Sequence, residues 1–263
     1  MFPVYFGSSG RRLFGLYSPA ERKRSPSRAV VLCHPWGREY EHVHRSVRML
    51  GSMLSTAGFD VLRFDYYGSG DAAGEAHEAT LAGWEGDILA AVEEIKDTTG
   101  ATRVALAGVR LGASLAAAAA VRTRTAVQEL VLWDPVVSGA DYLEELWSEV
   151  PDPGMRTWHL LARPAETGGG HEVQGYPLTG VLEHEIRALN LVDLVPSLPA
   201  RTLCVTSVEH PSYPALRTAF AGRAGGALTV ENIPSAPAWI EQEFFGAGVV
   251  PVQLLHRIKE WLG

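Results

Sequence analysis

The chain has 263 residues, of which 46% are hydrophobic and 20% charged, a balance that excludes disordered and collagen-like proteins. Its 23 basic and 30 acidic side chains give a net charge of −7, so no cationic surface for nucleic acid is expected. Cys33 and Cys204 are too few for a disulfide framework or a zinc site, which favours a reducing, cytoplasmic location. The longest apolar stretch, around Leu111–Val121, is too short to cross a bilayer, so no membrane association is expected.

The first part of the chain predicts a hairpin followed by alternating strands and helices. Residues 4–6 and 12–17 favour strands and flank a Gly-Ser-rich turn, which is typical of an antiparallel hairpin. Short apolar runs then alternate with segments of helical spacing. Strands are predicted at 29–33, 59–64, 103–107 and 129–133, and helices at 43–57, 84–99 and 111–121. This alternation indicates parallel strands joined by helical crossovers.

The alternation stops between residues 138 and 198, where helical pieces surround a glycine-rich loop. We interpret 138–198 as an inserted cap, and 1–137 with 199–263 as the core. Strands at 202–207 and 227–233 and helices at 215–221 and 252–262 complete the pattern. The predicted fold class is therefore α/β, with a mainly parallel eight-stranded sheet.

Residues that follow the strands are the first candidates for a site, because open parallel sheets bind ligands beyond the carboxyl ends of their strands. These residues are His34, Pro35, Trp36, Gly37, Asp65, Tyr66, Tyr67, Gly68, Arg110, Asp134, Pro135, Glu209, His210 and Ser235.

The segment Ala107–Ala113 has the glycine frame of a nucleophile elbow, G-x-S-x-G, between a strand and a helix. Arg110 occupies its middle position, where a serine would stand. A guanidinium cannot be deprotonated in proteins and accepts no hydrogen bond, so it cannot attack a carbonyl. The usual serine mechanism is excluded at this position.

Four motifs in one order resemble the α/β-hydrolase superfamily, in its serine-aminopeptidase-like group. They lie at residues 32–37 with Glu39 and Arg45, at 63–71, at 108–113 and at 132–139. Within this superfamily the chain most closely resembles the exosortase A system-associated hydrolases, because arginine stands at the middle of its elbow. The resemblance covers about the first 140 residues and implies an α/β-hydrolase fold with an inserted helical cap.

The resemblance also implies a triad in the order Ser, acid, His, with the histidine after the last strand. No histidine occurs in Pro234–Trp239, which follows the strand predicted at 227–233. Asp134 and Glu209 could each occupy the acid position. Since the nucleophile and the histidine of the triad are both missing from their expected positions, efficient ester hydrolysis is not expected.

The remaining polar candidates each have a catalytic and a structural interpretation. Arg110 could contact a substrate anion or carbonyl, or form an internal ion pair with Asp134 or Glu209. His34 and the neighbouring backbone could supply oxyanion donors, or the histidine could brace loops. His210 could be a general base oriented by Asp134, or an exposed loop histidine.

Aromatic side chains near these positions could line a substrate pocket or pack cap against core. The residues predicted to bind substrate are Trp36, Tyr40, Tyr66, Trp133 and Glu209, and Tyr67, Trp147 and Trp158 belong to the same aromatic group. His171, Glu183, His184 and Glu185 match no strong metal pattern, so no metal and no cofactor are expected.

Three functional hypotheses follow. The preferred one is a protein that binds an acyl, ester or thioester small molecule, which a carrier protein could present, and assists acyl transfer or a related biosynthetic step without an acyl-serine. The second is an inactive hydrolase that serves as a scaffold or carrier-protein partner. The third is an ester hydrolase with a shifted nucleophile, Cys33 or Ser69. The sequence does not indicate an oligomeric state.

Overall fold

The computed structural model describes residues 1–22, 26–123, 126–148, 170–223, 227–240 and 249–263. Its centre is an eight-stranded sheet in the order β1-β2-β4-β3-β5-β6-β9-β10. The strands are β1 (Phe2–Ser8), β2 (Arg11–Ser18), β3 (Arg28–Cys33), β4 (Asp60–Asp65), β5 (Arg103–Val109), β6 (Val127–Trp133), β9 (Arg201–Thr206) and β10 (Ala227–Asn232). The β1–β2 and β2–β4 pairs are antiparallel and the other neighbours are parallel, so the predicted mainly parallel sheet is confirmed.

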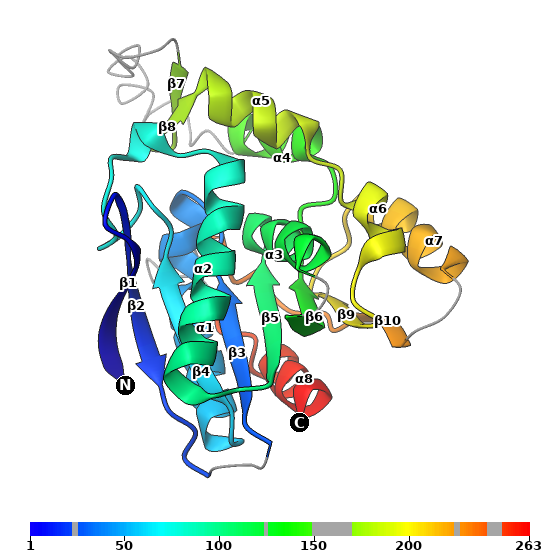
Figure 1. Cartoon of the computed structure of the whole chain (residues 1–263). Coiled ribbons are helices and arrows are strands. Elements are labelled where there is room, and N and C mark those ends of the chain that lie inside the picture. Colours follow the sequence, from blue (N-terminus) through cyan, green and yellow to red (C-terminus); the bar gives the residue numbers. More distant parts are fainter. Residues whose placement is uncertain (23–25, 124–125, 149–169, 224–226, 241–248) are drawn as a thin grey trace.

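Helices cover both faces of the sheet (Figure 1). They are α1 (Arg38–Thr56), α2 (Leu81–Thr99), α3 (Leu111–Arg122), α7 (Tyr213–Gly222) and α8 (Val252–Leu262). The short η1 (Ala76–Glu78) lies beside β8 (Tyr176–Thr179) instead. Apolar side chains of α1 and α8 form one core cluster with the sheet, and those of α2, α3 and α7 form the other. The helix predicted at 43–57 begins earlier in the structure, at Arg38. The prediction missed its first turn because that turn is polar and carries no apolar periodicity.

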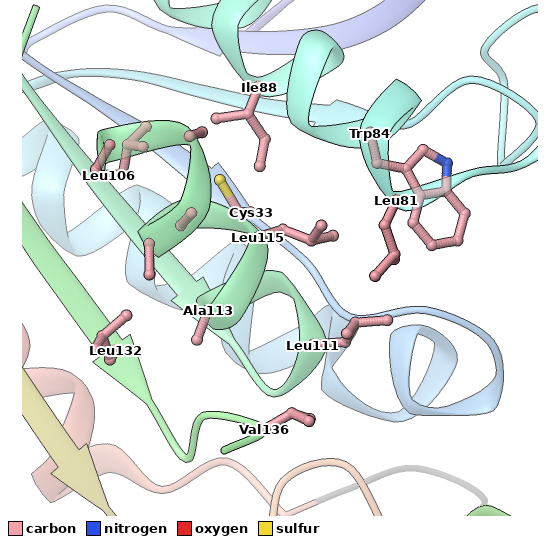
Figure 2. Packing of buried hydrophobic residues seen from close by; sticks show 14 of the residues in the cluster. Cys33, Leu81, Trp84, Ile88, Leu106, Leu111, Ala113, Leu115, Leu132 and Val136 are labelled. Carbon is pink, nitrogen blue, oxygen red and sulfur yellow. The ribbon is translucent and has the colours of Figure 1, made fainter. Parts of the chain in front are cut away.

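The alanine-rich helix α3 lies close against the centre of the sheet (Figure 2). Leu106 and Leu132 of the sheet and Ala113 and Leu115 of α3 are buried in the same cluster. A Cβ atom added at Gly108 would collide with the backbone of Gly112 in the first turn of α3. Small residues therefore allow the close approach of helix and strand that an elbow needs.

Between β6 and β9 lie α4 (Gly139–Ser148), β7 (Gly170–Val173), β8 (Tyr176–Thr179), α5 (Gly180–Ala188), α6 (Leu191–Leu194) and η4 (Val195–Ser197). Figure 1 shows α4, α5, β7 and β8 together beyond the carboxyl ends of the parallel strands. A Cβ at Gly139 would collide with the Ile186 carbonyl, so α4 and α5 are in close contact there. The antiparallel pair β7–β8 was not predicted, because its sequence carries no apolar alternation. Residues 149–169, including Trp158, lie outside the described residues, and the division into core and cap stays a prediction.

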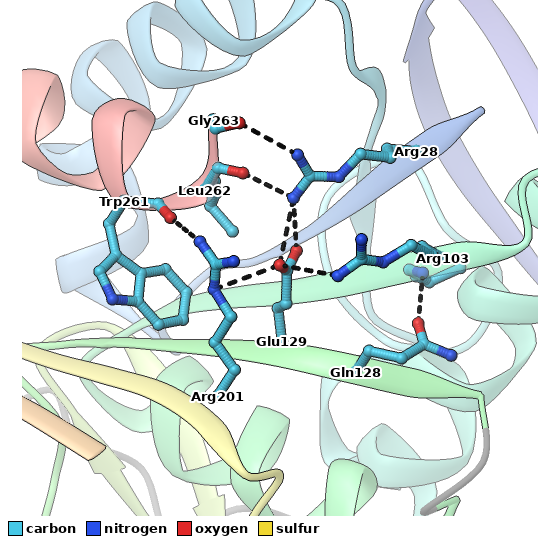
Figure 3. Close-up of polar contacts among 9 residues, drawn as sticks. Arg28, Arg103, Gln128, Glu129, Arg201, Trp261, Leu262 and Gly263 are labelled. Carbon is cyan, nitrogen blue, oxygen red and sulfur yellow. Dashed lines mark hydrogen bonds and ion pairs between the residues drawn. The ribbon is translucent and has the colours of Figure 1, made fainter. Parts of the chain in front are cut away.

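A polar cluster joins the opposite, amino ends of the strands (Figure 3). The buried Glu129 carboxylate pairs with Arg28 at 2.8 Å, Arg201 at 3.3 Å and Arg103 at 3.5 Å. Arg28 also donates to the Leu262 carbonyl at 2.6 Å. One carboxylate thus connects β3, β5, β6, β9 and the end of α8.

Within the described parts of the chain, no helix combines the length and the hydropathy that a membrane crossing requires.

Candidate functional site

The elbow keeps its strained backbone although it carries no nucleophile. Arg110 stands between β5 and α3 with φ 53° and ψ −126°, a region that side-chain-bearing residues rarely adopt. Its N–H donates to the Trp133 carbonyl at 3.0 Å, and its own carbonyl accepts from the Ala113 N–H at 3.0 Å. These bonds hold the residue-110 side chain at the position that the elbow frame predicts.

The Arg110 guanidinium forms two ion pairs with glutamates from distant elements. Its Nε donates to Glu39 Oε1 at 2.7 Å, and its Nη2 donates to Glu145 Oε2 at 2.6 Å. Glu39 lies in the first turn of α1 and Glu145 in the last turns of α4. The partners predicted from sequence, Asp134 and Glu209, were wrong. The internal ion pair itself exists, with other acids.

Two aromatic rings complete the surroundings of this guanidinium. Its Cζ atom lies 4.8 Å from the centroid of the Trp239 ring and 5.4 Å from that of Tyr142. The Tyr142 hydroxyl donates to Glu39 Oε2 at 3.0 Å, so both oxygens of this carboxylate are bonded. Trp239 comes from the segment after β10, where the resemblance placed the triad histidine. An indole ring from this segment therefore packs against the cation.

The charges of this cluster stabilise one another. Burial raises the pKa of Glu39, and the Arg110 charge and the Tyr142 hydrogen bond oppose that rise. Burial acts to lower the pKa of Arg110, but the two carboxylates outweigh it and hold that pKa well above its usual range. Arg110 is only 6% exposed. The cation is thus neutralised from within the protein.

His210 extends the cluster from the loop after β9. Its Nε2 contacts the Glu145 carboxylate, and its Nδ1 accepts from the Ser212 N–H at 3.2 Å. With Nδ1 as an acceptor, the imidazole proton lies on Nε2, directed at the carboxylate. Both ring nitrogens are engaged, so neither is left to take a proton from a substrate in this arrangement.

Asp134 does not orient His210 as predicted. Its carboxylate accepts from Ser207, from the N–H at 2.6 Å and from the hydroxyl at 2.8 Å. The residue is fully buried, and burial raises its pKa to about 6 although the Ser207 bonds act in the other direction. The predicted pair of Asp134 with His210 is therefore replaced by Asp134–Ser207 and His210–Glu145.

Glu209 lies apart from this cluster. It is exposed and accepts from Arg217 Nη2 at 2.9 Å and from the Asn232 side chain at 3.0 Å. The Arg217 hydrogen bond is the main cause that lowers the pKa of Glu209. The structure thus places this carboxylate beside α7 and β10, paired with its own cation.

The predicted aromatic residues occupy three separate places. Tyr40 and Tyr66 pack against His34, with ring centroids 4.3 Å and 4.6 Å from its imidazole. Trp36 lies 6.2 Å from the ring of Tyr176 in β8. Trp133 is buried in the core cluster of α1 and α8. The predicted substrate-binding set therefore does not form one wall, and its binding role stays a prediction.

Sequence reasoning missed Glu39, Tyr142, Glu145 and Trp239 as members of the site. One signal was present, because a buried arginine requires an anion and Glu39 follows the His34–Gly37 segment closely. For the metal question, the described residues contain no group of three or more His, Cys, Asp or Glu side chains placed to hold an ion. His171 instead packs against Trp147, with ring centroids 5.7 Å apart.

The strand order, the crossovers and the strained elbow define an α/β hydrolase fold. Residues 24–171, more than half of the chain, match the family model described as serine aminopeptidase, S33, and the chain belongs to this family.

Solved structures confirm the fold over the whole length. Est1E from Butyrivibrio proteoclasticus with bound ferulic acid has 18% identity and a TM-score of 0.71, over 98% of this chain and 97% of that one. DcsB in complex with its substrate analogue has 14% identity and a TM-score of 0.68, over 99% and 97%. The mouse α/β hydrolase domain-containing protein 10 has 16% identity and a TM-score of 0.62, over 100% and 98%. Among curated proteins, no sequence matches the chain significantly.

Proposed function

We propose that this α/β-hydrolase-fold protein forms no acyl-enzyme and acts by binding a partner, as an inactive hydrolase used as a scaffold. The observation that carries the proposal is the double ion pair of Arg110 with Glu39 and Glu145. At the one position where the fold presents a nucleophile, the side chain is buried, non-nucleophilic and bonded within the protein.

The cluster supports a mechanical role for the elbow. Glu39 belongs to α1, Arg110 to the β5–α3 turn, Glu145 to α4 and His210 to the loop after β9. We name these four residues the elbow clamp. Because Glu145 lies in the segment predicted as the cap, the clamp fastens this segment to the sheet. A fixed cap favours a constant binding surface over the opening that turnover of a substrate requires.

The hypothesis of an acyl ligand handled by Arg110 and His210 needs these side chains to contact that ligand. An anion that approaches Nε or Nη2 would have to displace Glu39 or Glu145. The displaced carboxylate would lose its cation, and that of Glu39 is buried. The competing hypothesis of a shifted nucleophile needs a reactive Cys33 or Ser69. Burial raises the pKa of the Cys33 thiol far above its usual range, so almost no thiolate is available.

The experiment is active-site labelling together with turnover. The purified protein is treated with a fluorophosphonate and with iodoacetamide and analysed by intact mass, and it is assayed with aryl esters and acyl thioesters. We expect no stoichiometric adduct in the folded protein, alkylation of both cysteines after unfolding, and no turnover above the rate of the Arg110→Ala variant. A single-site adduct on Cys33 or Ser69, or turnover that Arg110→Ala abolishes, would refute the proposal.

A further inference from the structure

A cavity between α1, β4 and the end of β2 contains two arginines and one carboxylate. Its volume is about 370 Å³, which lies within the range of small-molecule pockets, roughly 300–1,000 Å³. None of its lining residues belongs to the elbow clamp. They are Met1, Ser18, Pro19, Glu21, Arg48, Gly51, Ser52, Ser55 and Arg63. Met1 and Arg48 are exposed, so the cavity is accessible from solvent.

Arg63 is a half-buried cation without an ion-pair partner among the described residues. Its Nη2 donates to the Met1 sulfur at 3.3 Å, and a thioether is a weak acceptor. Other half-buried arginines of this chain each bond to a carboxylate, as Arg11, Arg28 and Arg257 do. A partly desolvated guanidinium requires an anion, so Arg63 indicates a place where one is missing from the protein itself.

Arg48 brings a second guanidinium to the same cavity. It is exposed and, within the described parts of the chain, forms no ion pair. Burial lowers the pKa of Arg63, and the Arg48 charge acts in the same direction, so the two cations repel each other. Tyr40 and Asp65 oppose this effect, but neither residue lines the cavity. An anion between the two guanidiniums would remove the repulsion.

Gly51 allows the Arg63 side chain to lie across the middle of α1. A Cβ atom at this position would be 3.5 Å from Arg63 Cδ and 3.7 Å from its Nε, so a side chain longer than that of alanine would displace the arginine. Glycine inside a helix costs about 1 kcal/mol relative to alanine. The helix is therefore less stable than it would be with alanine, at the point where the guanidinium passes it and reaches the cavity.

From this geometry we infer that the cavity binds a small phosphate monoester, whose phosphate group is held between Arg63 and Arg48. With Glu21 as the one acid of the lining, the two guanidiniums leave a formal charge of +1, which favours an anion. A phosphate monoester carries a charge of about −1.5 to −2 at pH 7 and three acceptor oxygens, so it can pair with both guanidiniums. A monocarboxylate neutralises only one of them.

Two serines make a prediction about the rest of the ligand. The Ser52 hydroxyl donates to the Arg48 carbonyl at 3.2 Å, and the Ser55 hydroxyl donates to the Pro19 carbonyl at 2.7 Å. Each hydroxyl oxygen can still accept a hydrogen bond, and both residues line the cavity. Hydroxyl groups on the ligand would supply the donors. A phosphate ester of a small polyol is thus expected to bind more tightly than inorganic phosphate.

The test is a titration of the ¹⁵N-labelled full chain, followed by NMR at constant ionic strength, with glycerol 3-phosphate, inorganic phosphate, glycerol and acetate. Both phosphates are expected to shift the signals of Gly51, Ser52 and the Arg63 Nε–H to saturation, with glycerol 3-phosphate the tighter. Glycerol and acetate are expected to leave these signals unchanged at the same concentrations. No saturable shift with glycerol 3-phosphate, or equal affinity for acetate, would overturn the inference. Weaker binding of glycerol 3-phosphate than of inorganic phosphate would overturn the assignment of a monoester.

Two variants locate the binding, and a third is the control. Arg48→Gln and Arg63→Gln are each expected to weaken glycerol 3-phosphate binding about tenfold or more, because each removes a charged hydrogen-bond donor. Arg45→Gln removes the same charge from an exposed position of α1 outside the lining and should bind nearly as the wild type does. If Arg63→Gln does not fold, Arg48→Gln, at an exposed position, still decides. Unchanged binding in Arg48→Gln, or an equal loss in Arg45→Gln, would contradict the site. The elbow clamp is untouched by these changes, so the result is independent of the proposed function.

Discussion

The elbow clamp makes a quantitative prediction for Glu39→Gln. The Glu39 and Arg110 side chains are each 7% exposed and lie 2.7 Å apart. Removing one partner of a buried ion pair costs about 3–5 kcal/mol, because the other charge stays buried without compensation. Arg110 keeps Glu145 at 2.6 Å, so we expect the lower end of this range, about 3 kcal/mol of unfolding free energy.

Glu145→Gln provides the comparison within the same cluster. The Glu145 side chain is 32% exposed, and solvent screens its interaction with Arg110. We therefore expect a cost of only about 1 kcal/mol, the upper end for exposed ion pairs. Glu144→Gln, at an exposed neighbour on the same helix, is the matched control and should change stability by less than about 0.5 kcal/mol.

Urea unfolding at pH 7, followed by tryptophan fluorescence, measures all three variants against the wild type. For a chain of this size a loss of about 3 kcal/mol corresponds to a decrease in Tm of roughly 6–12 °C. A Glu39→Gln protein within about 0.5 kcal/mol of the wild type would refute the reasoning. So would a larger loss in Glu145→Gln than in Glu39→Gln, because burial would then not decide the strength of the clamp.

Three further predictions concern buried groups outside the clamp. Burial raises the pKa of Asp134 from 3.8 to about 6, so the folded protein keeps a proton that the unfolded chain loses between these values, and wild-type stability falls over that interval. Relative to the wild type, Asp134→Asn should gain about 3 kcal/mol between pH 4 and 7 in urea unfolding, and a constant difference would contradict this. Glu129→Gln leaves three guanidiniums without their shared buried carboxylate and should cost about 3 kcal/mol or more, measured as a Tm decrease that salt does not abolish. Leu132→Ala, at a fully buried position of β6, should cost about 2–5 kcal/mol in the same assay, and a loss below 1 kcal/mol would speak against the packing in Figure 2.

Most of the sheet was predictable because each parallel strand is a short apolar run with glycine or polar residues at its ends. β3 and β5 differ from their predicted bounds by one or two residues. The β7–β8 hairpin was not predictable in this way. Its residues Gly170–Thr179 pack within the layer of α4 and α5 and alternate neither in hydropathy nor in charge. Its strands depend on tertiary contacts rather than on local pattern.

In the candidate site, too, some features were predictable from the sequence and others were not. The positions of Arg110, Asp134 and His210 after their strands followed from the sequence, because consecutive parallel strands bring their carboxyl ends to one edge. The side chains that bond to these three residues did not follow from the sequence. Which acid reaches Arg110 depends on the rotation of α1 about its axis and on the packing of α4, and neither is encoded in the residues near the elbow.

By itself the sequence determined that this protein carries a hydrolase frame whose attacking position holds an arginine and whose last loop lacks a histidine. Only the tertiary structure decided what that arginine does. Glu39 and Glu145 are 71 and 35 residues away from Arg110 along the chain, and the fold brings both carboxylates to the guanidinium. The physical reason is that a buried cation must find an anion, while the identity of that anion is set by the packing of helices rather than by sequence distance.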